Sequence, residues 1–430
     1  MTARSADDVD VAGTRRASPG PGQVARARAL GVRARLEPMV DAKRWRTAVL
    51  VLFAACGIGM ASWVARGPAV RDALHATTLQ MGLLLFAIAV GSIVGLLASG
   101  HLVERFGAAQ VIGLALPLAA AGFIAAGLTV ALPLGFIWVG GGLIVFGIGF
   151  SITDVAMNVS GAANERALGR AIMPVFHAFF SVGTVLGAGL GVLAELRHVP
   201  LAVHIPVVGV LIAAVGLLAP RYLEREARQT DEMDAAPAAF SGRLSVWRDP
   251  RTLLIGVIAL GMAFAEGSAN DWLALSVVDG VGTTNSTGAL VFGVFVASMT
   301  TARLGGVKLL DRFGRVPVLR VSAALAVVGL VLFIFVPNLG VAILGVVLWG
   351  FGAALGFPVA MSAAADDPRT AAARVSAVAT IGYFAFLVGP PAIGFLGEQF
   401  GLLRALLLVV LLVTIAGLVA GAAKETKVAA

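Results

Sequence analysis

The segment GIGFSITDVAMNVSGAANERALGRAIMPVFHAFFSVG, residues 147–183, consists of two apolar runs separated by a short charged turn. Asp154 and Asn158 lie inside the first run, and His177 lies inside the second. A carboxylate within a hydrophobic span costs roughly 2.5 to 3.5 kcal/mol on insertion scales, so it usually faces other protein or a water-filled cavity. The segment therefore predicts two membrane helices and makes Asp154 the first functional candidate.

The composition of the whole chain agrees with a membrane protein. Of its 430 residues 59% are hydrophobic and 13% are charged, with a mean hydropathy of +0.94. Soluble domains carry about a quarter charged residues. Cys56 is the single cysteine, which excludes a disulfide framework and a cysteine-based metal site, and we expect neither a cofactor nor a metal.

Apolar runs of about 20 residues, the length that spans a bilayer, recur through most of the chain. They predict an all-α membrane protein with twelve transmembrane helices, near 46–66, 78–100, 109–130, 134–161, 173–194, 202–220, 252–277, 286–307, 317–336, 339–363, 374–395 and 402–422. These spans fall into two groups of six.

The predicted spans divide the chain into five parts. We expect a disordered basic cytoplasmic tail (1–45), an N-terminal six-helix bundle (46–220), a cytoplasmic linker (221–250), a C-terminal six-helix bundle (251–422) and a short cytoplasmic tail (423–430). The net charge of +8 is concentrated in the first tail, where acidic residues accompany the arginines. We interpret that tail as a solvated segment and expect no nucleic-acid partner.

Arginine and lysine are distributed unevenly between the short loops. With the N-terminus inside, the cytoplasmic connections receive most of them: Arg105, Arg166, Arg170, Lys308, Arg312, Arg315, Arg369, Arg374, Lys424 and Lys427. The outer connections receive little beyond Arg71, Arg197 and Arg404. Because cytoplasmic loops carry the excess of positive charge, we expect both termini to be cytoplasmic.

An internal repeat relates the two groups of spans. His101–Gly107, HLVERFG, recurs as Lys308–Gly314, KLLDRFG, an offset of 207 residues (308 minus 101). The tripeptide Val-Ala-Met at 155–157 recurs at 359–361. The chain is thus predicted to contain two parallel six-helix repeats, an arrangement that places a binding site between the halves near the bilayer midplane.

The two acid-Arg-Phe-Gly turns resemble the loop signature of the major facilitator superfamily, over about residues 46–422. The resemblance implies twelve helices and gating roles at the cytoplasmic helix ends for Glu104, Arg105, Asp311, Arg312 and Arg315. It also implies a monomer that moves a small-molecule substrate by alternating access. We expect the bacterial plasma (inner) membrane as its location, and no enzymatic activity.

Within that superfamily, residues 154–183 resemble the fucose permease branch in their acid-x-x-x-Asn pattern and in Arg170, Phe179, Ser181 and Gly183. The stretches 63–68 and 265–272 are still closer to a sister group of poorly characterised bacterial facilitators. The likeness to the sugar symporter is incomplete, because its first-helix acid falls at about Val64 here. The resemblance implies proton coupling through Asp154 and a sugar, polyol or related solute.

Asp154 is the predicted proton acceptor, and the alternative is a carboxylate that pairs with a neighbouring helix. The repeat places Pro358 at the matching position, so the fold itself does not require an acid there. His177 could relay a proton or bind solute, or it could simply form a packed helix–helix hydrogen bond. Asn158 is a candidate binding residue one turn beyond Asp154.

The seventh span carries a second polar cluster. Glu266 and Asn270 share one face, and Asp271 points away from them. We expect Glu266 as a second proton-coupling group, Asn270 as a binding residue and Asp271 near the outer gate. The alternative is a salt bridge from one of these acids to Arg66.

Arg66 and Trp63 lie near the outer end of the first span. They could be an interfacial pair with a snorkelling arginine, or Arg66 could close the outer gate against Asp271 or hold substrate. Trp349 and Phe357 are candidates for stacking on a solute, although most aromatic residues in membrane helices serve packing. Arg303 is expected to serve the cytoplasmic latch.

The leading hypothesis is a proton-coupled secondary transporter for a small organic solute. The alternative is a proton-driven antiporter that exports small amphipathic compounds or drugs. A membrane sensor without transport activity is a third possibility, although no soluble output domain is evident. Because no nucleotide-binding P-loop, metal-ligand cluster or nucleophile arrangement appears, ATP-driven transport and enzymatic chemistry are not expected.

Overall fold

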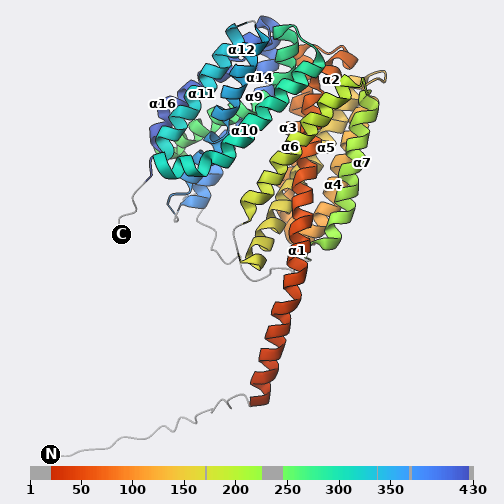
Figure 1. Cartoon of the computed structure of the whole chain (residues 1–430), viewed down its shortest axis with the longest axis vertical. Coiled ribbons are helices and arrows are strands. Elements are labelled where there is room, and N and C mark those ends of the chain that lie inside the picture. The colour runs from red at the N-terminus through yellow and green to blue at the C-terminus, as the bar shows by residue number, and fades with distance from the viewer. Residues whose placement is uncertain (1–20, 170–171, 225–245, 337, 368–369, 426–430) are drawn as a thin grey trace, which may run out of the picture.

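The computed structural model describes residues 21–169, 172–224, 246–336, 338–367 and 370–425. Every regular element in these residues is helical. Figure 1 shows two groups of long helices side by side, with α1 to α7 in one and α9 to α16 in the other. We call them the N half and the C half.

In the N half, α1 to α7 are followed by a single 3-10 turn. Their bounds are α1 Pro21–Ala65, α2 Gly67–Leu74, α3 Thr78–Phe106, α4 Ala108–Thr129, α5 Gly135–Leu168, α6 Met173–Leu196, α7 Leu201–Leu218 and η1 Ala219–Tyr222.

In the C half, a short 3-10 turn precedes α9 and another follows α16. The bounds are η2 Val246–Arg248, α9 Pro250–Val281, α10 Asn285–Phe313, α11 Arg315–Phe335, α12 Leu339–Ala353, α13 Gly356–Ala364, α14 Ala371–Phe400, α15 Leu402–Ala405, α16 Leu407–Leu418 and η3 Val419–Ala423.

The described residues contain twelve helical segments long and apolar enough to cross a membrane. The predicted all-α fold and the number of spans are therefore confirmed. Each predicted span overlaps one of these segments, since a run of about 20 apolar residues is a strong signal for a membrane helix.

The first helix begins earlier than expected. We predicted a disordered tail over 1–45, whereas α1 is helical from Pro21. The stretch 21–41 is rich in alanine and arginine, which are good helix formers, so the helix extends without an apolar period. Residues 1–20 and most of the expected linker, 225–245, lie outside the described residues, as do Arg170 and Arg369.

The repeat seen in the sequence reappears in the helices. Both α3 and α10 are 29 residues long, and each follows a threonine cap, Thr77 and Thr284, that accepts a backbone N–H. Each ends at a glycine with positive φ, Gly107 at 79° and Gly314 at 75°. Glycine adopts this conformation without steric cost, so the recurring Phe-Gly pair marks the same helix end in both halves.

Within each half, glycines allow the third and fourth spans to approach closely. A Cβ on Gly122 of α4 would lie 2.5 Å from the carbonyl oxygen of Gly142 in α5. A Cβ on Gly329 of α11 would lie 2.4 Å from the carbonyl oxygen of Gly345 in α12. Small residues at such crossings let two membrane helices pack backbone to backbone.

The two halves differ in their fourth span. α5 is continuous, whereas its counterpart is interrupted between Ala353 and Gly356 into α12 and α13. Pro358 lies four residues after Ala354 and has no N–H to donate to the Ala354 carbonyl. The proline that replaces Asp154 in the repeat therefore accounts for the break.

The helices meet differently at the two ends of the molecule. α1 begins and η3 ends at one end, which we call the terminal end, and α2 lies at the opposite, far end (Figure 1). In Figure 1 the ribbons of the halves lie close together at the far end and separate toward the terminal end. The most extensive contacts between the halves are made by α14 with α3 and by α10 with α6, and α2 also contacts α9 and α10.

Candidate functional site

Asp154 lies on α5 with its side chain exposed, although it is within a membrane span. Asn158, one turn further on, donates to the Asp154 carbonyl oxygen at 2.8 Å and to its carboxylate Oδ1 at 3.3 Å. The carboxylate is close enough to interact electrostatically with the Cys56 thiol of α1 and the Tyr383 hydroxyl of α14. Tyr383 belongs to the C half, so Asp154 faces the space between the halves.

His177 on α6 also lies between the halves. Its ring meets Phe53 of α1 edge-on, with ring centroids 5.2 Å apart. The side chain is exposed and interacts electrostatically with Arg303 of α10. The structure thus brings the predicted residues Asp154, Asn158 and His177 to the surface that the N half turns toward the C half.

Glu266 of α9 pairs with Arg303, which we had expected at the cytoplasmic latch. Arg303 Nη2 is 2.7 Å from Glu266 Oε2, and Arg303 Nε donates to the Ala354 carbonyl oxygen at 3.2 Å. Both side chains keep partial exposure, 33% for Arg303 and 20% for Glu266. The latch expectation for Arg303 is therefore wrong, since the arginine is one of the groups within the spans.

Asn270 and Asp271 are half-buried on α9, which runs without a break through Gly267 and Ser268. In the part of the chain that the structure describes, neither side chain has a hydrogen bond or an ion pair. A continuous helix keeps Asp271 on a different face from Glu266, as the spacing predicts.

Arg66 does not pair with Asp271, nor with any other acid of α9. Its Nε lies 2.7 Å from Glu195 Oε1 on α6, and its Nη2 donates to the Val199 carbonyl oxygen at 2.9 Å. The guanidinium is 4% exposed and also approaches His204 of α7. In this conformation Arg66 therefore neither closes a gate against Asp271 nor snorkels, and its buried guanidinium is not accessible to a solute, because the charge is neutralised inside the N half.

The two predicted tryptophans lie in hydrophobic cores. Trp63 is 4% exposed and meets Phe123 edge-on inside the N half. Trp349 is fully buried, and its Nε1 donates to the Ala265 carbonyl oxygen at 3.0 Å. Neither ring is accessible to a solute in this conformation, so the binding predictions for both are corrected to packing.

Phe357, in contrast, is only partly buried. Its ring centroid lies 6.0 Å from that of Tyr383, which in turn lies 6.4 Å from that of Phe386. The Tyr383 side chain is 50% exposed. These three rings form an aromatic wall on the C half close to Asp154.

At the terminal end, Arg105 and Arg312 do not pair with the neighbouring acids in this conformation. Arg105 and Arg312 lie over the adjacent rings of Phe106 and Phe313, at 5.4 Å and 5.3 Å. Glu104 and Asp311 are exposed, and the described residues show no ion pair for either. The acid that pairs with a predicted gating arginine is instead Asp366, which binds Arg315 and was not predicted from the sequence.

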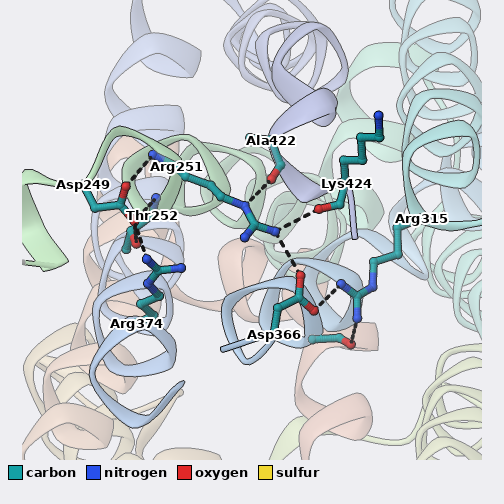
Figure 2. Close-up of polar contacts among 9 residues, drawn as sticks. Asp249, Arg251, Thr252, Arg315, Asp366, Arg374, Ala422 and Lys424 are labelled. Atoms are coloured by element: carbon teal, nitrogen blue, oxygen red, sulfur yellow. Dashed lines mark hydrogen bonds and ion pairs between the residues drawn. The ribbon is translucent and has the colours of Figure 1, made fainter. Parts of the chain in front are cut away.

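Asp366 follows α13 and accepts from two arginines. Arg315 Nη1 lies 2.6 Å from its Oδ1, and Arg251 Nη2 lies 2.9 Å from its Oδ2 (Figure 2). Arg251 also donates to the carbonyl oxygens of Ala422 and Lys424. Burial alone would raise the pKa of Asp366, but the hydrogen bonds and charges of these arginines lower it below its ordinary value.

This terminal cluster joins the start of α9, the end of α13 and the segment after η3 within the C half. A second ion pair, Arg374 with Asp249 at 3.2 Å, lies beside it (Figure 2). A shallow hollow of about 340 Å³ is lined here by Arg251, Leu254, Gly421, Ala422, Lys424 and Glu425. It lies outside the space between the halves, so we do not assign it to the solute.

At the far end, polar contacts join the two halves directly. Arg71 of α2 forms an ion pair with Asp279 of α9, and Asn285 Nδ2 donates to Asp72 Oδ2 at 2.9 Å. Glu398 of α14 accepts from the backbone N–H of Leu79 at 3.2 Å. We call these contacts the far-end latch, and sequence reasoning missed them, apart from noting Arg71 as an outer charge.

Asp72 is stabilised in its ionised form by this latch. Burial opposes ionisation, but the hydrogen bonds from Asn285 and Arg71, together with the charge of Arg71, lower the pKa of Asp72 below its ordinary value. The same contacts outweigh burial at Arg71 and raise its pKa.

The family model of the Major Facilitator Superfamily matches residues 47–385 and 272–427. The chain belongs to this superfamily. An uncharacterised transporter of Sinorhizobium fredii, y4wD, is 35% identical over 82% of this chain and 91% of its own length. Relatives and fold identify this facilitator as a multi-pass membrane transporter of small molecules rather than an enzyme.

Solved structures show the same fold. The nucleoside transporter NupG superposes with a TM-score of 0.74 at 13% identity, covering 89% of this chain and all of that one. FucP, a major facilitator transporter in the outward conformation, gives a TM-score of 0.61 at 18% identity over 88% of this chain and 98% of that one. At these identities the likeness establishes the fold of the facilitator, and its solute has to be argued from its own residues.

Proposed function

We propose that this facilitator is a proton-coupled secondary transporter of a small, hydroxyl-bearing organic solute such as a sugar, a polyol or a nucleoside. It works as a monomer in the bacterial inner membrane, with both termini in the cytoplasm. The basic loops at the terminal end support this orientation. The acid-x-x-x-Asn pattern of Asp154 and Asn158, which resembles the fucose permease branch, supports the solute class.

One observation carries the proposal. Asp154 is a carboxylate within a membrane span whose only hydrogen-bond partner among the described residues is its own neighbour Asn158. No arginine or lysine neutralises it there, and Tyr383 of the other half lies close by. An unpaired carboxylate at membrane depth is expected to exchange protons with the solute pathway. We therefore assign Asp154 as the primary proton-coupling group.

Polar and aromatic residues of both halves supply, in this proposal, the groups that a polar solute requires. Asn158 and His177 from the N half, and Asn270 and Phe357 from the C half, are the proposed binding residues. Glu266 is the second coupling group, held by Arg303. A ring of the aromatic wall provides a flat apolar face, which suits the face of a sugar or a nucleobase.

The contacts between halves support alternating access. The far-end latch closes one end, and the described residues show no hydrogen bond or ion pair between the halves at the terminal end. With the termini in the cytoplasm, this arrangement is an inward-facing state. Transport then requires the far-end latch to open while the terminal ends of the halves approach.

The test is uptake into proteoliposomes under an imposed pH gradient, with labelled sugars, polyols and nucleosides. Wild type should accumulate at least one of them when protons flow inward. Asp154→Asn should lose accumulation against a gradient but keep solute exchange at equal pH, because exchange needs binding and movement without net proton transfer.

Glu224→Gln provides the matched control, since Glu224 is an exposed acid at the end of the N half. It should accumulate solute as wild type does. If Asp154→Asn also accumulates solute as wild type does, Asp154 does not couple protons to transport.

A second candidate function is proton-driven export of small amphipathic compounds. The aromatic wall of Phe357, Tyr383 and Phe386 favours it, because such rings also bind apolar drugs. Movement of a drug opposite to the proton flow in the same liposomes would select this alternative.

A further inference from the structure

Arg303 is held in the membrane by two unlike partners. Its Nε donates to the Ala354 carbonyl, which Pro358 leaves without a helical donor, and its Nη2 pairs with Glu266. The carbonyl contact does not depend on the charge of Glu266, whereas the carboxylate contact weakens when Glu266 takes up a proton. The guanidinium would thus stay in place when the ion pair is released.

The remaining face of Arg303 is turned toward the other half. The side chain is 33% exposed and interacts electrostatically with His177 of α6. Its Nη1 has no hydrogen bond to any described residue. Because Nε is held by a carbonyl and Nη1 has no hydrogen bond to a described residue, the guanidinium is positioned to donate to an oxygen of a bound solute.

We propose that Arg303 is a solute-binding residue that exchanges Glu266 for an acceptor oxygen of the solute. Proton uptake by Glu266 releases Nη2, which then donates together with Nη1 to the solute. Release of the solute restores the ion pair and expels the proton from Glu266. This inference rests on the proposed function and adds to it the residue through which solute binding and protonation are linked.

Other groups near the pair do not offer the same linkage. α12, α13 and α16 carry no titratable side chain. Within the spans, α9 itself brings Asp271 on a different face from Glu266, α14 brings Tyr383, α6 brings His177 and Glu195, and α1 brings Cys56. None of these forms an ion pair with Arg303 or Glu266. Glu266 is therefore the acid whose charge decides the freedom of Arg303.

The experiment is binding to the purified, detergent-solubilised full chain, which does not depend on transport. The probes are L-fucose, myo-inositol and inosine, measured by calorimetry from pH 5 to 8. In wild type, at least one probe should bind more tightly as pH falls. Glu266→Gln should bind tightly at all pH values, whereas Arg303→Gln should bind about ten- to a hundredfold more weakly.

Infrared difference spectra provide a second measurement. Addition of the bound probe to wild type should produce a carbonyl band of a protonated carboxyl group, absent in Glu266→Gln and present in Asp154→Asn. Arg320→Gln is the control, because Arg320 is an exposed arginine on the next helix, α11. It should retain wild-type affinity and pH dependence.

The outcomes separate this inference from the proposed function. Three outcomes would overturn the role of Arg303. Arg303→Gln could bind with wild-type affinity, Glu266→Gln could keep the wild-type pH profile, or wild type could bind none of the probes in a pH-dependent way. Proton-driven uptake lost in Asp154→Asn would still stand in the first two cases. Binding with the expected pH linkage but without uptake into liposomes would instead refute the transport proposal alone.

Discussion

At the scale of single residues, the charges within the spans divide into paired and unpaired groups. Arg66 and Glu195 neutralise each other inside the N half, and Glu266 is neutralised by Arg303. Among the residues that the structure describes, Asp154 has the Asn158 amide as its hydrogen-bond partner and no ion pair. A buried ion pair contributes little net stability, but removing one partner leaves a costly charge behind. A stability measurement therefore distinguishes the two kinds of charge. Removing one member of a structural pair lowers the free energy of unfolding, whereas neutralising the unpaired Asp154 does not leave a partner charge behind.

Arg66→Leu should therefore destabilise the protein by about 3 to 5 kcal/mol, because Glu195 would remain buried without a partner. The double variant Arg66→Leu with Glu195→Leu should recover much of that loss. Thermal unfolding of the detergent-solubilised protein measures both. A double variant as unstable as the single one would show that the pair is not isolated from other charges.

At the scale of helices, stability depends on where backbones touch. Gly122 of α4 faces the α5 backbone directly, whereas Gly141 of α5 has nothing within 4 Å of its Cβ direction. Glycine spacing in the sequence indicates helix contact in general, but it does not say which glycine is at the crossing.

Gly122→Ala should push α4 and α5 apart and cost about 1 to 3 kcal/mol, as overpacking does elsewhere. Gly141→Ala is the matched control and should be neutral or slightly stabilising, since alanine reduces the freedom of the unfolded helix. Melting temperatures of the two variants make the comparison. Equal destabilisation would mean that loss of glycine itself, rather than contact with α5, matters.

At the scale of the whole molecule, the far-end latch holds one of the states that transport requires. Arg71 and Asp279 come from different halves, so a covalent link between them prevents the far end from opening.

Arg71→Cys with Asp279→Cys, joined by a short bis-maleimide, should abolish transport and leave solute binding from the terminal side intact. Each single variant, treated in the same way, should keep transport. Cys56 is buried and should not react. Full transport by the cross-linked protein would show that the halves do not need to separate at the far end.

The latch also has a defined pH range. Because the pKa of Asp72 is lowered in the folded protein, its stabilisation is fully present above the ordinary value of 3.8 and is lost as pH falls through the lower folded value. Between about pH 5 and 8, closure of the far end should thus not change through Asp72. Labelling of a cysteine at Ser286, a half-buried neighbour that makes none of the latch contacts, measures closure across this range. If labelling changes near neutral pH, and the same change occurs in Asp72→Asn, then a group other than Asp72 makes closure sensitive to pH.

Several features were predictable because they depend on local pattern. Apolar length predicted the twelve spans, and the recurring Phe-Gly turns predicted the duplicated helices α3 and α10. Asp154 was recognisable as a candidate because a carboxylate within an apolar span is rare and the repeat has Pro358 at the matching position, but whether it pairs with a neighbouring helix stayed open in the sequence. The partners of Arg66 and Arg303 were not predictable, because a long side chain at membrane depth can reach acids on several helices.

The sequence by itself determined the membrane class, the number of spans, the duplication and the superfamily, all of which follow from hydropathy and from motifs within one segment. Only the tertiary structure decided which charges pair, which tryptophans are buried and where the halves touch. The physical reason is that a buried charge or ring is stabilised by the face of whichever helix lies against it. That face depends on the rotation and crossing of helices that are far apart in the chain.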